Sequence, residues 1–282
     1  MLYIIIVLYK TKLEDSLTYK ALKNNLEKLK TLGTKILIYN NSPEIEIPLS
    51  KDYIVHTPTE NLMLAGAYNY ALQDAEQGGY KWLLLLDQDT ELTETYINEL
   101  VAFIESSNSE EYDVALPILK KGDIYLSPES YKKNKGPFWE TNKIKSNVDL
   151  DNISNKDIVV AYNSAALLKV STIAKINGFD MEYPLDMLDH RYFYQLNQIN
   201  AKIYVLPSAF EQNLSLLDEK NPMSIFRYRG YIAACHKYAK QLGFVTLLSY
   251  KLRLCLHVVS QIIRPYKRQY IKYTLKQLFF KW

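Results

Sequence analysis

Two aspartates follow a run of leucines in the segment 83–89, Leu-Leu-Leu-Leu-Asp-Gln-Asp. Such a run is typical of a strand buried on both faces, and its end would expose Asp87 and Asp89 at the ligand-binding edge of a sheet. Carboxylate oxygens suit hard divalent cations such as Mn²⁺ or Mg²⁺. A cation there would neutralise the charge that builds on a departing diphosphate. The alternative interpretation is a helix cap or a surface turn, because Asp and Thr both favour helix starts.

The elements around this segment alternate between strand and helix patterns. Apolar and β-branched runs predict strands at residues 3–9, 35–39, 52–56, 82–86 and 202–206. Apolar residues at helical spacing predict helices at residues 13–32, 61–75, 93–106 and 187–198. The polar stretch 119–156 indicates loops, with room for a hairpin, that cover or flank the site. This order predicts an α/β fold with a mainly parallel, Rossmann-like sheet between helices, with ligands at the carboxyl ends of the strands.

The charge is unevenly distributed along the chain. Residues 220–282 contain 13 Lys or Arg and no Asp or Glu, although the whole chain has 34 basic and 31 acidic residues. We therefore expect a domain at 1–219 and a basic, amphipathic helical region at 220–282, broken near Gly243 and Pro265. This region suits the surface of an anionic membrane. The alternatives are an ordinary helical subdomain with a solvated basic face and, last, a nucleic-acid-binding tail, so we expect no nucleic acid partner.

Short apolar segments and cysteines predict the compartment. The first nine residues are apolar but too few for a signal peptide or a membrane span. Cys235 and Cys255 have no metal-ligand spacing around them, and we expect both to be buried, apolar residues in a reducing compartment. The prediction is a cytoplasmic protein, peripheral on the inner face of the plasma membrane.

Several segments that could contribute to a site occur in a recognisable order. They are the strand ending at Tyr9, the turn 39–42 (Tyr-Asn-Asn-Ser), the segment 60–69 (from Glu-Asn to Ala-Gly-Ala-Tyr-Asn), the Asp-Gln-Asp at 87–89, the segment 163–180 ending in Gly-Phe-Asp, and the acidic segment 185–189. Over residues 1–215 this order resembles the family 2 glycosyltransferases of the GT-A fold. The Asp-Gln-Asp form and the paired acids are similar to the rhamnosyltransferase-like branch of that family.

The resemblance implies roles for the residues at the sheet edge. Asp89 would bind a Mn²⁺ or Mg²⁺ cofactor, and Asp87 would contact the ribose or the metal and its water shell. The nucleotide-binding residues would be Tyr9, Thr11, Asn40, Asn61, Asn69 and Asp87. For Asn61 and Asn69, helix capping is an equally good interpretation.

The resemblance also implies that Asp189 is the catalytic base. Inversion by direct displacement needs one carboxylate to take the proton of the acceptor hydroxyl. Asp186 would share a face with Asp189 if this segment is helical, and the alternative is that both are acids favoured by a helix N-terminus. We expect His190 to be a surface or satisfied residue and Arg191 to be solvated.

This chain departs from the family pattern at four positions. Met63 stands where Gly is common, and Tyr68 stands where many members have Arg. Gln212 and Asn213 stand where many relatives carry a metal-binding His. The cation shell would then be completed by water and by the phosphates of the donor.

Together these features predict a metal-dependent, inverting glycosyltransferase. It would move a sugar from a nucleotide-diphosphate donor, dTDP-rhamnose or a UDP-sugar, to a lipid-linked or growing bacterial surface polysaccharide, and an oligomer is compatible with the sequence. One alternative is a nucleotidyltransferase, which needs a glycine-rich phosphate loop that residues 9–12 lack. Another is a non-catalytic, membrane-bound scaffold of the same fold.

Overall fold

The computed structural model of the chain describes residues 1–154, 156–212 and 223–279. Two compact units divide the chain. The first comprises Met1–Glu129, Lys143–Asn152 and Val159–Gln212, and the second comprises Ser130–Asn142, Ile153–Ile158 and Asn213–Trp282. The second unit therefore takes in two segments from within the expected domain 1–219. The expected boundary at 219 and 220 lies outside the described residues.

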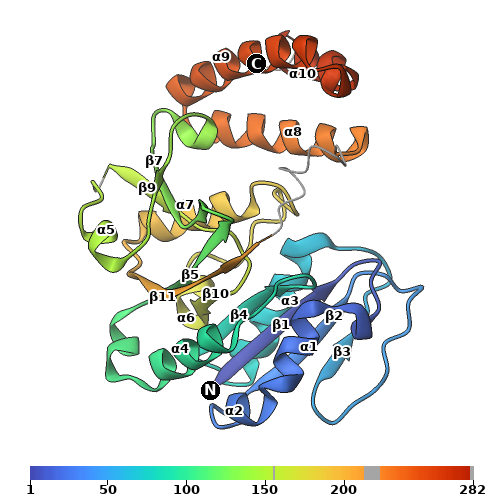
Figure 1. Ribbon diagram of the computed structural model, residues 1–282, viewed down its shortest axis with the longest axis vertical. Coiled ribbons are helices and arrows are strands. Elements are labelled where there is room, and N and C mark those ends of the chain that lie inside the picture. The colour runs from blue at the N-terminus through green and yellow to red at the C-terminus, as the bar shows by residue number, and fades with distance from the viewer. Residues whose placement is uncertain (155, 213–222, 280–282) are drawn as a thin grey trace. The chain divides into compact units, whose positions relative to one another are not determined.

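The first unit is built on a mainly parallel sheet (Figure 1). Among the described residues its strands run in the order β11-β5-β10-β4-β1-β2-β3, with β6 paired to β5. Their bounds are β1 Leu2–Leu8, β2 Lys35–Asn40, β3 Ile54–His56, β4 Trp82–Asp87, β5 Val114–Lys121, β6 Ile124–Ser127, β10 Ala166–Lys169 and β11 Ile203–Glu211. Only β10 and β6 pair antiparallel within this described sheet. The predicted fold class is confirmed.

Strand β1 lies in the interior of this sheet, between β4 and β2, and sets the position of the site. It pairs in parallel with β2 and with β4, so that Leu8 lies opposite Asn40 and Val7 lies opposite Asp87. All seven residues of β1 are buried, as expected for a strand covered on both faces. The carboxyl ends of the three strands therefore meet at one edge, where ligands bind in sheets of this kind.

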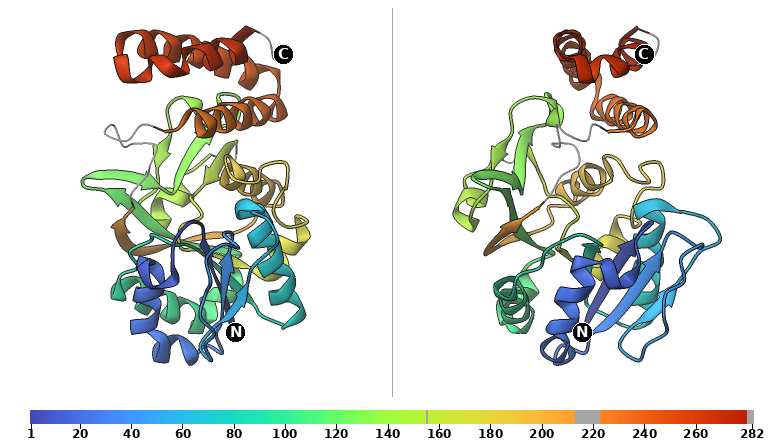
Figure 2. Two further views of the ribbon diagram at one scale, coloured as in Figure 1. Left: turned by 90° about the vertical axis from the view of Figure 1, so that its right-hand side faces the viewer. Right: turned by 45° about the vertical axis from the view of Figure 1, so that its right-hand side comes forward.

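Helices cover both faces of the sheet (Figure 2). Helices α1 (Leu17–Asn24) and α4 (Glu94–Glu105) lie on one face, and α3 (Met63–Gln77) lies on the other. The buried side of α3 carries Ala67, Ala71 and Ala75, spaced by one turn, which lets the helix approach the strands closely. Helix α6 (Val170–Lys175) packs beside α3.

The single helix predicted for residues 13–32 is wrong. The segment forms a short 3₁₀ turn, η1 (Leu13–Asp15), and two helices, α1 and α2 (Leu26–Lys30). Ser16 caps α1 by accepting a hydrogen bond from the Tyr19 backbone N–H at 3.2 Å. Asn25 leaves the helical conformation between α1 and α2, and its side chain donates to the carbonyl of Ala21 at 3.0 Å. Local side-chain bonds of this kind compete with the helix.

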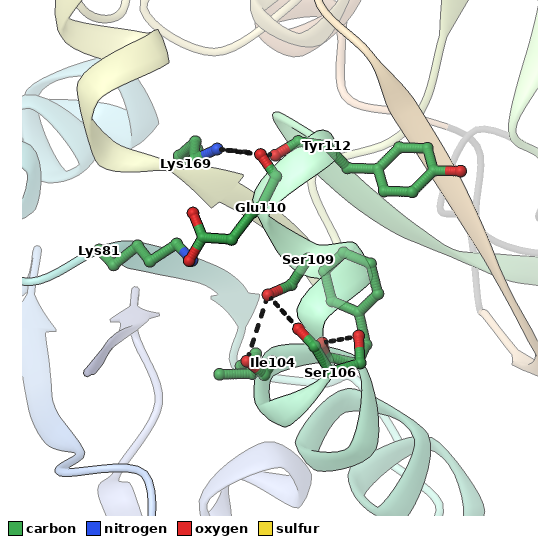
Figure 3. Close-up of polar contacts among 8 residues, drawn as sticks. Lys81, Ile104, Ser106, Ser109, Glu110, Tyr112 and Lys169 are labelled. Carbon is green, nitrogen blue, oxygen red and sulfur yellow. Dashed lines mark hydrogen bonds and ion pairs between the residues drawn. The ribbon is translucent and has the colours of Figure 1, made fainter.

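The amino-terminal edge of the sheet is held by polar contacts around the 3₁₀ turn η2 (Ser107–Glu111), shown in Figure 3. Lys81, just before β4, forms an ion pair with Glu110. Lys169, at the end of β10, donates to the backbone carbonyls of Glu110 and Tyr112 at 3.1 and 3.2 Å. Ser109 closes the end of α4 by donating to the Ser106 carbonyl at 2.8 Å. These contacts fix β4 at the end opposite to Asp87.

The region 119–156 contains the expected hairpin and, in addition, part of a second small sheet. Strands β5 and β6 form an antiparallel hairpin, and a second sheet has the order β8-β7-β9. The remaining elements between β6 and β11 are β7 Glu129–Lys132, η3 Gly136–Phe138, β8 Asn142–Lys143, α5 Asn147–Asp151, β9 Asp157–Val160 and α7 Leu188–Gln198.

The described part of the second unit is mainly helical. Its elements after residue 222 are α8 Ile225–Leu242, α9 Phe244–Ile263, η5 Pro265–Tyr270 and α10 Ile271–Phe279. Breaks at Gly243, with φ +116°, and at Pro265 confirm the predicted positions. The core contains a buried polar network, in which Tyr228, Gln261 and Thr274 share hydrogen bonds of 2.7 to 3.0 Å.

The expectation that both cysteines are buried needs correction, and one basic residue of this region is buried. Cys235 is buried, but Cys255 is exposed on α9. Lys251 is 4% exposed and is not one of the solvated cations, because its ammonium group donates to the carbonyls of Gln277 and Leu278 at the end of α10. Within the described residues, no helix is long and apolar enough to cross a bilayer.

Candidate functional site

The turn 87–90 after β4 is held in place by the start of α1. The Thr18 hydroxyl donates to the Asp87 carbonyl at 2.5 Å and accepts from the Thr90 N–H at 3.0 Å. The Ser16 hydroxyl donates to the Gln88 carbonyl at 2.7 Å. These bonds pair backbone groups that no longer have a partner strand. They therefore hold the turn that carries the carboxylates of Asp87 and Asp89. The sequence interpretation missed Ser16 and Thr18, although a Ser ahead of a helical run is a recognisable cap signal.

Asp87 lies in a strongly polar and partly desolvated environment. Its Oδ2 accepts a hydrogen bond of 2.6 Å from the hydroxyl of Ser164, a contact that the sequence interpretation also missed. Burial raises the pKa of Asp87 to about 6, the Ser164 bond opposes the rise, and the negative charges of Asp89 and Asp189 add to it. Asp89 is exposed, yet desolvation raises its pKa as well. The structure thus brings three predicted site carboxylates into electrostatic contact.

Asp189 stands in the first turn of α7, and its charge acts on Asp87 at the carboxyl end of β4. Its Oδ1 accepts from the backbone N–H of His190 at 2.8 Å and contacts Nδ1 of the same residue at 2.9 Å. Met187, which precedes the helix, has the left-handed φ of +61°. Residues other than glycine rarely adopt this backbone conformation. Here it sets the direction in which α7 begins. Asp186 lies in the turn before α7, so the two acids do not share a helical face.

His190 is satisfied, which is one of the two expected alternatives, whereas Arg191 is not solvated. The side chain of His190 is 12% exposed. Burial lowers its pKa, but the charge and hydrogen bond of Asp189 and the charge of Glu129 reverse this, so that the pKa is raised overall. His190 is therefore a largely buried, satisfied partner of the predicted base. The expectation that Arg191 is solvated is wrong, because its Nε donates to Asp180 Oδ2 at 2.8 Å.

The loop after β1 joins the ends of the neighbouring strands. The Tyr9 N–H donates to the side-chain oxygen of Gln88 at 2.8 Å, and the Lys10 N–H donates to the Ser42 hydroxyl at 2.7 Å. Thr11 donates to the Tyr9 carbonyl at 3.2 Å. Tyr9 remains 46% exposed. The structure therefore brings Tyr9 and Thr11 to the same edge as Asp87, and their contact with a base stays a prediction.

Asn40 and Asn61 hold turns on the predicted nucleotide side. Asn40 is 1% exposed, and its amide donates to the Ile45 carbonyl at 2.7 Å while its oxygen accepts from the Ser42 N–H at 3.1 Å. Asn61 accepts from the Met63 N–H at 2.8 Å, a cap-like contact just before α3. Met63 has a φ of +57°, a backbone conformation that glycine adopts more readily than other residues. Nucleotide contacts by both asparagines remain predictions.

Asn69 connects α3 to the segment that precedes the predicted base. Its amide donates to the Phe179 carbonyl at 2.7 Å, and its oxygen accepts from the Phe179 N–H at 2.8 Å. This residue lies inside α3, so the helix-capping interpretation is wrong. The two bonds fix the Gly178-Phe179 backbone and, through it, the approach to α7. Because both the nitrogen and the oxygen of the amide are already engaged, little hydrogen-bonding capacity is left for a nucleotide. Contact between Asn69 and a nucleotide remains a prediction.

The residues at the site suit a hard cation only in part. Asp87 and Asp89 supply oxygen ligands, as Mn²⁺ and Mg²⁺ prefer. No group of three or more His, Cys, Asp or Glu that could hold a metal occurs among the described residues. The side-chain oxygen of Gln212 is buried without a partner in the described chain, and Asn213 lies outside the described residues. The donor set therefore fits a cation that takes most of its ligands from water and a diphosphate.

Comparison with known proteins establishes the fold. No protein-family model and no curated protein sequence matches the chain. The structure is similar to that of GalNAc-T7 solved with UDP, GalNAc and Mn²⁺, with a TM-score of 0.55 and 12% identity, over 89% of this chain and 53% of that one. The chain thus spans about half the length of that structure. S. aureus TarS 1–349 gives a TM-score of 0.49 and 15% identity, over 99% of this chain and 72% of that one. The fold is of the GT-A glycosyltransferase type.

Proposed function

We propose that the protein is an inverting glycosyltransferase that uses a nucleotide-sugar donor. The observation that carries the proposal is the meeting of Asp87, Asp89 and Asp189 at the carboxyl edge of a GT-A-type sheet. The first two stand on the turn after β4 and the third on α7, so the acids come from separate elements. This separation suits a reaction in which one side of the site holds the leaving group and the other activates the acceptor.

Asp189 acts as the general base. It takes the proton of the acceptor hydroxyl as that oxygen attacks the anomeric carbon and the bond from this carbon to the diphosphate breaks. The attack comes from the face opposite the leaving group, so the configuration is inverted. The contacts of His190 with Oδ1 orient the carboxylate and leave Oδ2 for the acceptor.

Asp87 and Asp89 face the donor. Together with the donor's phosphates they would hold Mn²⁺ or Mg²⁺, which supplies charge neutralisation for the departing diphosphate. The mutual repulsion of the carboxylates, which helps to raise the pKa of Asp87, favours a cation at this place. Ser164 and the first turn of α1 keep the carboxylates in position.

The resemblance to the rhamnosyltransferase-like branch favours dTDP-rhamnose or a UDP-sugar as donor. The GalNAc-T7 structure contains UDP and Mn²⁺, which supports the same class of donor and cofactor here. The acceptor would be a lipid-linked or growing bacterial surface polysaccharide.

The exposed face of α9 supports an acceptor at a membrane surface. Apolar side chains recur on it every three or four residues and are 44% to 71% exposed, namely Val245, Leu248, Leu252, Leu256, Val259 and Ile263. Arg264 and Arg268 are exposed at the end of this helix. An apolar stripe with cations beside it suits a helix lying at an anionic lipid interface. The protein would then be peripheral on the cytoplasmic face of the membrane.

A donor panel tests the proposed function. Purified protein is mixed with dTDP-rhamnose, UDP-sugars or GDP-sugars, with and without Mn²⁺, and the melting temperature and donor turnover are measured. We expect one nucleotide sugar to raise the melting temperature and to be hydrolysed or transferred, more strongly with Mn²⁺. Binding without turnover would favour the scaffold. Release of pyrophosphate from a nucleoside triphosphate and a sugar phosphate would favour a nucleotidyltransferase.

A further inference from the structure

Two buried tyrosines on different helices end beside the carboxylates of the proposed site. Tyr68 lies on α3 and Tyr192 on α7, and both side chains are fully buried. The charges of Asp87 and Asp189 act on both phenols. Because Asp87 belongs to the donor side and Asp189 to the acceptor side, the phenols lie near the space between the two.

An aromatic contact fixes the two rings. The Phe179 ring lies 5.2 Å from Tyr68 at an interplanar angle of 57°, and 5.2 Å from Tyr192 at 79°. The backbone of Phe179 is in turn held by the two hydrogen bonds from Asn69. The rings therefore have little freedom to turn their hydroxyl groups elsewhere.

Neither hydroxyl group has a hydrogen-bond partner among the described residues. A buried hydroxyl without a partner costs free energy, and two of them beside two carboxylates are not explained by the packing of the rings. Tyr96 provides a contrast in the same unit. It is equally buried, but its hydroxyl donates to the Ala165 carbonyl at 2.8 Å.

We propose that the hydroxyls of Tyr68 and Tyr192 bind hydroxyl groups of the transferred sugar. This inference rests on the proposed glycosyl transfer. A sugar hydroxyl can both donate to and accept from a phenol, and it is neutral, so it can approach two carboxylates. A phosphate group carries negative charge, and the two carboxylates would repel it from this place. The atoms are closed to solvent, so binding of the sugar requires a local displacement of the groups that cover them.

The test compares sugar nucleotide with nucleotide alone. Tyr68→Phe and Tyr192→Phe remove one hydroxyl each and keep the ring. We measure the dissociation constants of UDP-glucose, UDP-N-acetylglucosamine and dTDP-rhamnose, and of UDP and dTDP, by calorimetry. For the nucleotide sugar that wild type binds, we expect each variant to bind about 3- to 30-fold more weakly. The affinity for the matching diphosphate should stay unchanged.

The melting temperature separates this role from a structural one. Replacing an unpartnered hydroxyl by hydrogen should leave the melting temperature unchanged or raise it, whereas Tyr96→Phe, the matched control, should lower it by removing a made hydrogen bond. A lower melting temperature with unchanged sugar-nucleotide affinity would overturn the inference, as would equal losses for sugar nucleotide and diphosphate. If wild type binds no nucleotide sugar, the proposed function itself fails.

Discussion

The carboxyl edge of the sheet and the exposed face of α9 are unfavourable for an isolated chain in opposite ways. At the edge, carboxylates are partly removed from water and repel one another, so that the pKa of Asp87 rises to about 6. On α9, apolar side chains stay in water, and no Asp or Glu occurs in residues 220–282. Each region would be relieved by a partner of the opposite character. A cation and a sugar suit the first, and an anionic lipid surface suits the second.

The largest effect should come from the base at the sheet edge. Asp189→Asn removes the group that takes the acceptor's proton but keeps its size, so we expect kcat for transfer to fall by about 100- to 10,000-fold. The measurement is steady-state transfer with the donor found in the panel, together with the melting temperature to show that the fold persists.

Asp149→Asn is the control for this change. Asp149 is an acid in the first turn of α5 and accepts from the Lys145 N–H at 2.7 Å. The same change of charge there should leave transfer nearly unaffected. If Asp189→Asn keeps wild-type turnover, Asp189 is only a helix-terminal acid and the assignment of the base is wrong.

Asp87→Asn should separate stability from activity at the same edge. The pKa of Asp87 is higher in the folded chain than the usual value of 3.8, so the folded state binds this proton more tightly than the unfolded state. Ionisation of Asp87 therefore costs stability above about pH 6, and the cost disappears below about pH 4. We expect the variant to be more stable at pH 7, by at most about 3 kcal/mol, and inactive.

Urea unfolding at pH 7 and at pH 4 measures this effect, with Asp74→Asn as the control of opposite sign. Burial raises the pKa of Asp74, but the hydrogen bonds from Lys35 and Tyr3 outweigh burial, so that this pKa is lowered overall. Its charge is therefore stabilising at pH 7, and its removal should destabilise the protein there. A loss of stability in Asp87→Asn at pH 7 would contradict the strained edge that we describe.

The sequence predicts the residues at the carboxyl edge of the sheet well where a local pattern determines their position. The apolar run before Asp87 fixes β4, and short loops carry the chain to the sheet edge, so the predicted edge residues do gather there. Contacts between distant residues have no local signal. Ser164 meets Asp87 across 77 positions, and Asn69 binds Phe179 across 110. Arg191 was expected in solvent for the same reason, since Asp180 reaches it only through the turn before α7.

A change on α9 tests the other half of the comparison. Leu252→Asp with Leu256→Asp removes two exposed leucines and adds two negative charges, so binding to vesicles of phosphatidylglycerol and phosphatidylcholine should fall by about 10- to 100-fold. Cosedimentation measures the binding, and salt should weaken what remains in wild type.

Leu49→Asp is the matched control, because Leu49 is 92% exposed but belongs to the first unit and not to α9. We expect it to keep vesicle binding. The opposite result would be that wild type does not bind vesicles and that the α9 variant loses self-association. The exposed face would then bind a second copy of the chain, and the membrane proposal would fail.

The smallest effect concerns the hydrogen bond that moderates the acidity of Asp87. Ser164→Ala removes the donor that lowers the pKa of this carboxyl, so the pKa should rise further above about 6. If Asp87 must be ionised to hold the cation, the acid limb of the pH profile of kcat/KM moves upward, by less than about one pH unit for one neutral hydrogen bond. Ser109→Ala, which removes an equally buried hydroxyl at the opposite edge of the sheet, should leave the limb in place. A downward shift in Ser164→Ala would mean that Asp87 is not the group that titrates, and the strain at the edge would then belong to Asp89 or Asp189.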